Sequence, residues 1–142
     1  VKRVAIIGIG LIGSSLARAA REYGAAGSVA LYDGSAHVRA RAREIGLGDV
    51  YDDVSDCVRD ADIVILATPV GVMGEVLKDG AAGVLCEFTM SSLARSLALL
   101  LADESKRSAM GAAGPLIAAR FERSAQIQRY AEGLKRIAGE SA

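Results

Sequence analysis

The sequence predicts an α/β fold in which a parallel sheet is covered by helices on both faces. Short apolar runs alternate with segments of helical periodicity through the first half of the chain. The runs are apolar at nearly every position, as in strands buried on both faces, and a glycine-rich turn follows the first of them. Right-handed crossovers then arrange about five strands in the order 3-2-1-4-5, a doubly wound sheet.

The elements of the first half follow from their patterns in chain order. Strands are expected at residues 3–7, 28–32, 50–51, 62–67 and 83–87. Helices are expected at residues 11–23, 35–45, 55–60 and 72–77. Ser35 should cap the second helix, and Gly46 or Gly48 should end it. The first helix is expected to turn toward the core an apolar stripe made of Ile12, Leu16, Ala19 and Tyr23.

The pattern changes after residue 91, where only helices are expected. The first carries an apolar stripe at Leu93, Leu97, Leu100 and Leu101. A helix from Asp103 should break at Gly111 and again at Gly114-Pro115, because proline fits the first turn of a helix but not its interior. The last helix, from about Ser124, carries on one side Ile127, Tyr130, Leu134 and Ile137. These C-terminal helices should pack on the sheet or on a partner, and residues 1–142 are predicted to form a single domain.

Composition excludes several classes of protein. The 17 basic and 17 acidic residues balance, which argues against nucleic acid or an anionic membrane as the main partner. No apolar run reaches the roughly 18 to 20 residues of a membrane span, and no signal peptide is visible, so a cytoplasmic protein is expected. Cys57 and Cys86 lack metal-ligand spacing and are interpreted as reduced, structural thiols.

The loop after the first strand carries the clearest chemical signal. Gly8, Gly10 and Gly13 have the spacing G-x-G-x-x-G between a strand and a helix. The first glycine can make the tight turn, the second leaves room for phosphates, and the third lets the helix pack closely on the strand. The helix N-terminus favours negative charge, and Ser14 or Ser15 could donate a further hydrogen bond. The pattern predicts a Rossmann-like site for the pyrophosphate of a dinucleotide.

An acid at the end of the second strand sharpens this prediction. Asp33 lies 20 residues past Gly13, where it could accept hydrogen bonds from the adenosine ribose and repel a 2′-phosphate. The cofactor predicted is therefore NAD rather than NADP. The alternative is a glycine turn followed by a turn-forming Asp33-Gly34 pair. Thr68-Pro69 ends the fourth strand at the same sheet edge, either beside the cofactor or simply as a strand terminator.

Other polar residues are better explained without a ligand. His37, the only histidine, lies near the adenosine end and is interpreted as a surface residue rather than a catalytic one. Arg39, Arg41 and Arg43 suggest a solvated helix face, with contact to a 2′-phosphate as a minor alternative. No metal site is expected. Helix caps and solvated loops account better than a cation site does for the acidic residues of this region, which are Asp49, Asp52, Asp53, Asp56, Asp60 and Asp62.

The first half resembles the N-terminal part of prephenate and arogenate dehydrogenases. The stretches RVAIIGIGLIGSSLARAAREYG, VALYDGS, EIGLGDVYDD and DADIVILATPVGVMGEVL carry the likeness, over about residues 2–77. The resemblance implies NAD binding, with Leu11 and Ile12 lining the loop and Thr68 and Pro69 near the nicotinamide. That family continues with an acid-glycine-serine-lysine segment, a catalytic histidine in an HPM-like motif and a large helical domain. None of these is found here, so no catalytic residue is assigned.

The second half resembles a different family, the C-terminal end of GT-B-type retaining glycosyltransferases. GEVLKDGAAGVL, LARSLALLLADESKRSAMGAAG and a final helix with QIQRY carry this likeness over about residues 71–138. The E-x7-E pair of that family is absent, and Pro115 interrupts a helix that usually continues. The combination suggests a mosaic of residues 1–77 and 78–142, as in an engineered or computed chimera; a divergent natural protein is the alternative.

Three hypotheses for function follow. The first is a Rossmann-like module that binds NAD without catalysis. An engineered chimeric scaffold is one form that such a module could take. The second is a minimal prephenate or arogenate dehydrogenase that acts alone or as a homo-oligomer. The third is a structural chimera that binds no ligand. Titration with NADH separates the first from the third.

Overall fold

The computed structural model describes residues 1–68, 77, 80–87, 89–119, 127–128 and 132. Its internal contacts divide the chain into two compact units, Val1–Val70 and Gly71–Ala142. The helix expected at 72–77 and the last helix, from Ser124, lie almost entirely outside the described residues. The single domain expected from the sequence stays a prediction.

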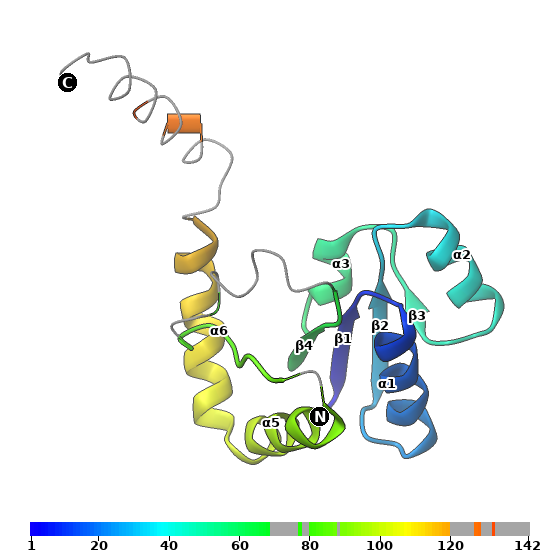
Figure 1. The fold of residues 1–142 in the computed structure, drawn as a ribbon, viewed down its shortest axis with the longest axis horizontal. Helices are drawn as coiled ribbons and strands as arrows, with labels where there is room; N and C mark the ends of the chain where they lie inside the picture. The colour runs from blue at the N-terminus through cyan, green and yellow to red at the C-terminus, as the bar shows by residue number, and fades with distance from the viewer. Residues whose placement is uncertain (69–76, 78–79, 88, 120–126, 129–131, 133–142) are drawn as a thin grey trace. The chain divides into compact units, whose positions relative to one another are not determined.

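A four-stranded parallel sheet forms the centre of the first unit (Figure 1). Its strands run in the order β3-β2-β1-β4, which confirms the first four positions of the predicted order. The register places Ala5 opposite both Ala30 and Val64. The bounds lie within one or two residues of those expected: β1 Arg3–Ile7, β2 Ser28–Tyr32, β3 Asp49–Val50 and β4 Ile63–Leu66.

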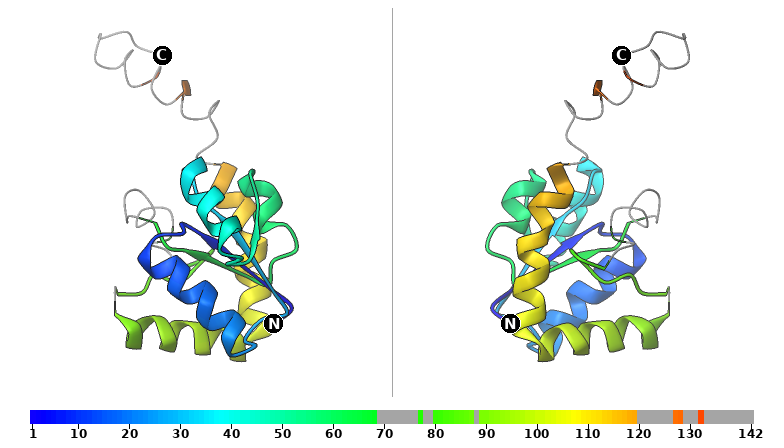
Figure 2. Two further views of the ribbon diagram at one scale, coloured as in Figure 1. Left: turned by 90° about the vertical axis from the view of Figure 1, so that its right-hand side faces the viewer. Right: turned by 90° about the vertical axis from the view of Figure 1, so that its left-hand side faces the viewer.

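Helices cover both faces of this sheet. They are α1 Leu11–Glu22, α2 Ala36–Glu44 and α3 Val54–Val58. On one face, Cys57 of α3 packs with Ala5 and Ala30 in a cluster with no exposed surface. On the other face, α1 approaches Ile6 at Gly13, and Figure 2 shows α1 and α3 on opposite sides of the strands. Strand residues therefore alternate between two apolar layers, as continuous apolar strands require.

The buried face of α1 differs from the predicted stripe. Its buried residues are Gly13 and Ala17. Of the predicted stripe, Ile12 and Leu16 are half-buried, whereas Ala19 is exposed and Tyr23 is 80% exposed. The prediction selected residues by hydrophobicity alone. The helix instead turns its smallest residues to the sheet, because these allow its backbone to approach β1 closely.

The helix ends in this unit use the residues expected of them. Ser35 Oγ accepts a hydrogen bond from the Val38 N–H at 3.4 Å and caps α2, and Gly46 follows α2 with φ +60°. Asp53 caps α3 by accepting from the Ser55 N–H at 2.7 Å. Within the ranges that the structure describes, no group of histidine, cysteine and acidic side chains is placed to hold a metal ion.

Replacing Asp62 by asparagine should make the stability of the fold less sensitive to acid. Asp62 Oδ2 accepts from the N–H groups of Lys2 at 2.7 Å and Arg3 at 2.9 Å, joining the starts of β1 and β4. The Arg3 amide first, and then the Lys2 amide, hold the pKa of Asp62 below its ordinary value of 3.8. This stabilisation is complete above that ordinary value and is lost as pH falls through the lower pKa of the folded protein.

Urea unfolding of wild type and Asp62→Asn, followed from about pH 6 down to about pH 2, measures this effect. The wild type should be the more stable protein at the upper end, and the difference should shrink as pH falls. A difference that stays constant across the series would contradict the assignment.

The second unit contains two described helices of some length, α5 Met90–Ala102 and α6 Glu104–Ala118. Thr89 caps α5, and Asp103 caps α6 by accepting from the Lys106 N–H at 2.8 Å. Residues 83–87, expected to be a fifth strand, are assigned to neither strand nor helix. The described elements of this unit are helical, so the segment finds no strand partner there. That these helices pack on the sheet stays a prediction.

The helix from Asp103 does not break where the sequence predicted. α6 runs without interruption through Gly111, Gly114 and Pro115. The proline ring of an interior position crowds the carbonyl four residues earlier, here that of Gly111, and leaves that carbonyl without its usual donor. Gly111 is exposed, so water can satisfy it.

Two further expectations can be compared with the structure. Cys57 is buried, as expected of a structural thiol, and burial raises its pKa; Cys86 is exposed, because its segment is not part of a sheet. In the apolar stripe of α5, Leu93, Leu97 and Leu100 are half-buried and Leu101 is exposed. Over the part of the chain that is described, no helix combines the length and apolarity needed to cross a membrane.

Candidate dinucleotide-binding site

Gly8 makes the turn out of β1 in a conformation and a space that suit only glycine. Its φ is +94°, and its N–H donates to the Tyr32 carbonyl at 2.8 Å. A Cβ at this position would lie 2.6 Å from the Ala67 carbonyl oxygen. The loop is therefore held between the ends of β2 and β4, at the carboxyl edge of the sheet.

Gly10 and Gly13 have opposite surroundings. A Cβ on Gly13 would lie 1.9 Å from the Gly8 carbonyl oxygen, so this glycine allows the contact between helix and loop. Among the described residues, no heavy atom lies within 4 Å of a Cβ placed on Gly10. Gly10 is also the N-cap of α1; it forms no side-chain cap, and the first turn has no acidic residue. The N-terminus of α1 therefore has neither a side-chain cap nor an acid of its own first turn, which suits the binding of a pyrophosphate.

Asp33 connects the end of β2 to the glycine loop. One carboxylate oxygen accepts from the Ile9 N–H at 2.8 Å, and the other accepts from the Ser35 N–H at 2.9 Å. The side chain is half-buried and held by both bonds. Because each carboxylate oxygen has two lone pairs, Asp33 keeps capacity to accept from ribose hydroxyls.

The other residues predicted for the site have mixed outcomes. Leu11 is 87% exposed at the start of α1, and Ile12 is half-buried. Thr68 is exposed, with Cγ2 3.1 Å from the position of a Gly8 Cβ, so it does lie beside the loop. Pro69 lies outside the described residues.

The two serines after the loop do not offer free hydroxyl donors. Ser14 Oγ and Ser15 Oγ both donate to the Leu11 carbonyl, at 3.2 and 2.7 Å. Hydroxyls in the interior of a helix commonly bond to a carbonyl one turn earlier. The phosphate contact expected of them is therefore not prepared in this structure.

Sequence reasoning missed the role of Arg39. Its side chain is only 15% exposed, and its guanidinium lies 5.6 Å from the centre of the Tyr32 ring. Nη1 donates to the carbonyl oxygens of Asp33 at 2.7 Å and Gly34 at 3.3 Å, and Nε donates to Asp52 Oδ1 at 3.0 Å. The predicted solvated face is thus wrong for Arg39. Asp52 follows β3 at the same sheet edge as Asp33, and this placement was the available signal.

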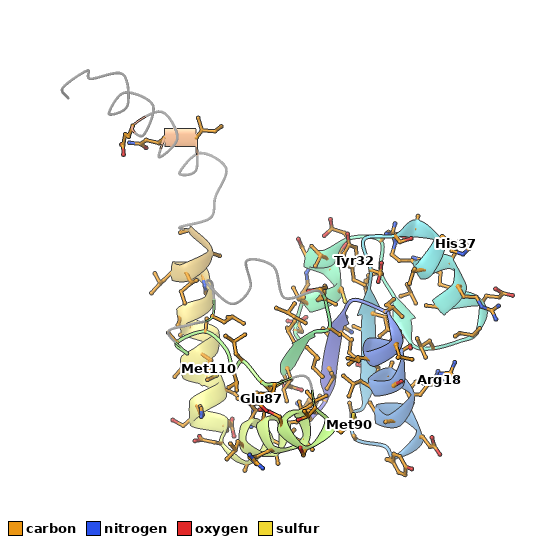
Figure 3. The ribbon with its side chains drawn as sticks, in the orientation of Figure 1. Arg18, Tyr32, His37, Glu87, Met90 and Met110 are labelled. Atoms are coloured by element: carbon orange, nitrogen blue, oxygen red, sulfur yellow. The ribbon has the colours of Figure 1, made fainter. Side chains whose placement is uncertain are left out.

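Arg43 completes this charged group. Its Nη2 lies 2.9 Å from Asp52 Oδ2, and the guanidinium groups of Arg43 and then Arg39 hold the pKa of Asp52 below its ordinary value. Arg41 points elsewhere and pairs with Glu44 at 2.6 Å. His37 lies in the first turn of α2 with an exposed side chain, as predicted (Figure 3).

A depression in the first unit lies away from the glycine loop. It has a volume of about 660 Å³, and its lining includes Arg18, Arg21 and Ile45, at the C-terminal ends of α1 and α2. Arg18 is exposed on α1 (Figure 3). The C-terminal ends of helices carry negative partial charge, so this depression suits a phosphate less well than the loop.

A glycine turn, a free helix N-terminus and an acid at the end of the second strand, all on a parallel sheet, define a Rossmann-like domain of the dinucleotide-binding class. Residues 16–94 match the family model described as prephenate dehydrogenase, nucleotide-binding domain. The chain belongs to that family.

Two known proteins show the extent of the similarity. The cyclohexadienyl dehydrogenase of Zymomonas mobilis subsp. mobilis (strain ATCC 31821 / ZM4 / CP4) is 57% identical over 76 residues, which are 53% of this chain and 26% of the relative. The chain thus spans about a quarter of that relative's length. A crystal structure of prephenate dehydrogenase from A. aeolicus, in complex with hydroxyphenyl propionate and NAD+, aligns with a TM-score of 0.48 at 22% identity. It covers 68% of this chain and 38% of the other.

These matches change where the dehydrogenase-like part ends. The family match continues to residue 94, whereas the resemblance in the sequence ended near residue 77. It therefore includes 24 residues, 71–94, of the stretch that resembled glycosyltransferases. Neither the family match nor the curated relative supports a glycosyltransferase part or a chimera.

Proposed function

We propose that this chain binds NAD and provides the cofactor-binding side of a dehydrogenase that oxidises prephenate or arogenate. The observation that carries the proposal is the Asp33 carboxylate, held by the amides of Ile9 and Ser35 beside the open N-terminus of α1. A ribose acceptor and a phosphate donor set are thereby joined in one rigid loop. The family assignment agrees with this arrangement.

Each residue of the loop has a defined part in such a site. The first amides of α1 bind the pyrophosphate, and the missing side chain of Gly10 leaves the space for it. Asp33 accepts from the adenosine ribose hydroxyls, and its charge disfavours a 2′-phosphate. NAD supplies the hydride acceptor when it is bound. Thr68, beside Gly8, lies at the carboxyl edge near the nicotinamide side.

Titration of the purified chain with NADH, followed by fluorescence or calorimetry, tests this proposal. Saturable binding is expected, with NADH bound more tightly than NADPH. Absence of saturable binding at millimolar NADH would overturn the proposal and favour a domain that has kept the fold without a ligand.

Replacing Asp33 by alanine should raise the dissociation constant for NADH by about tenfold to a hundredfold, as expected when hydrogen bonds to a charged acceptor are removed. The dissociation constant for NADPH should rise less, because the same change removes the repulsion between Asp33 and the 2′-phosphate. The ratio of the two dissociation constants, measured on wild type and Asp33→Ala, should therefore narrow. A ratio that does not change would remove Asp33 from the ribose site.

Turnover by this chain itself is a second candidate function. It is favoured by the 57% identity to a protein named cyclohexadienyl dehydrogenase. Oxidation also needs an acid or base beside the substrate, and the only histidine, His37, lies near the adenosine end. Incubation with NAD and prephenate or arogenate decides: accumulating NADH supports turnover, and none at high protein concentration leaves the chain a cofactor-binding part.

A further inference from the structure

A half-buried cation lies directly behind the candidate ribose acid. Arg39 reaches from α2 to the backbone of Asp33 and Gly34, and it stacks on Tyr32. All three of these residues lie at or just after the end of β2. A cation at this place could bind a 2′-phosphate on the adenosine ribose, because guanidinium groups suit phosphate oxygens.

The structure keeps that cation occupied. Nη1 is shared between two main-chain carbonyls, and Nε donates to the carboxylate of Asp52 at 3.0 Å. The same carboxylate lies 2.9 Å from Arg43, on the outer side of the group. Asp52 itself is exposed, with 72% of its side-chain surface accessible. Asp52 follows the two-residue strand β3 and is not part of the sheet core. Its contacts are ion pairs with Arg39 and Arg43, so its role is to hold and neutralise these two side chains.

We propose that Arg39 and Asp52 together determine the choice between NAD and NADP at this site. This inference rests on the proposed NAD binding. Arg39 orients the backbone that carries Asp33, so that the carboxylate meets the ribose hydroxyls. Asp52 neutralises Arg39 and holds its Nε, so the guanidinium is not offered to a 2′-phosphate. NADP is thus disfavoured twice, by the charge of Asp33 and by the restraint on Arg39.

The decisive experiment removes the repulsion first and the restraint second. In an Asp33→Ser background, adding Asp52→Asn should lower the dissociation constant for NADPH by about tenfold. This is the order of effect expected when a guanidinium released from its carboxylate gains a charge-assisted hydrogen bond to a phosphate oxygen. Dissociation constants for NADH and NADPH are measured by fluorescence, and thermal unfolding checks that each variant is folded.

Two further variants assign the gain to one arginine. Adding Arg39→Met to the double variant should abolish the tighter binding of NADPH. Adding Arg43→Met should preserve it, although both arginines contact Asp52 and both changes remove one positive charge. If the Arg39–Asp52 pair only stabilised the fold, the dissociation constants for NADH and NADPH would instead rise in parallel in every variant.

The outcomes separate this inference from the function on which it rests. Suppose that the wild type binds NADH but that adding Asp52→Asn to Asp33→Ser leaves the dissociation constant for NADPH unchanged. This result would overturn the inference and leave the proposed function standing. So would a gain that survives Arg39→Met or that depends on Arg43. Wild type that binds neither dinucleotide would overturn both the inference and the proposed function.

Discussion

Replacing Gly10 by valine should raise the dissociation constant for NADH by about a hundredfold or more, equivalent to about 2.7 kcal/mol. No atom of the residues that the structure describes lies within 4 Å of a Cβ added at this position. That space adjoins the first amides of α1, where the pyrophosphate is proposed to lie. The change should cost little stability, about 1 kcal/mol or less, because Gly10 has φ −74° and ψ −163°, a backbone that other residues adopt.

Gly10→Ala provides the matched control for this prediction. It adds one carbon where valine adds three, so NADH should be weakened to an intermediate degree. Fluorescence titration gives the affinities, and thermal unfolding shows that both variants are folded. Wild-type affinity in Gly10→Val would place the phosphates elsewhere and contradict the site.

Replacing Gly13 by alanine should destabilise the fold by about 3 kcal/mol, the upper range for overpacking in a core. The new Cβ would lie 1.9 Å from the Gly8 carbonyl oxygen and 3.3 Å from Ile6 Cγ2. Neither the loop nor the strand can retreat, because Gly8 is hydrogen-bonded to Tyr32 at 2.8 Å. The helix would have to move away from β1.

Urea unfolding of Gly13→Ala and Gly10→Ala compares the same substitution three residues apart. Only the first should shift the midpoint strongly, since only the first meets backbone atoms. Equal, small shifts in the two variants would show that α1 does not pack on β1 as closely as the structure indicates.

Most of the first unit could be predicted from the sequence. β1 and β2 have the bounds expected, and Ser35, Gly46 and Asp33 occupy the places their chemistry suggested. These features depend on neighbours within a few residues, or on the fixed spacing between strand, loop and helix. Such local constraints are legible in one sequence.

The errors arose where distant residues decide the outcome. Hydrophobicity pointed to Tyr23 on the buried face of α1, but close packing on β1 selected Gly13 and Ala17. Residues 83–87 have the composition of a strand, yet a strand forms only where another offers its hydrogen bonds. A series of arginines on α2 resembled a solvated face until Asp52 was placed beside Arg39.

The sequence by itself determined a parallel α/β domain with a glycine loop and an acid placed for a dinucleotide, because these depend on periodicity and spacing along the chain. Only the tertiary structure decided which residues of α1 meet the sheet, since hydrophobicity favoured Tyr23 whereas Gly13 and Ala17 are the buried ones. It also brought Arg39 and Asp52 to the ribose end, because parallel strands place residues distant in sequence at one edge of the sheet.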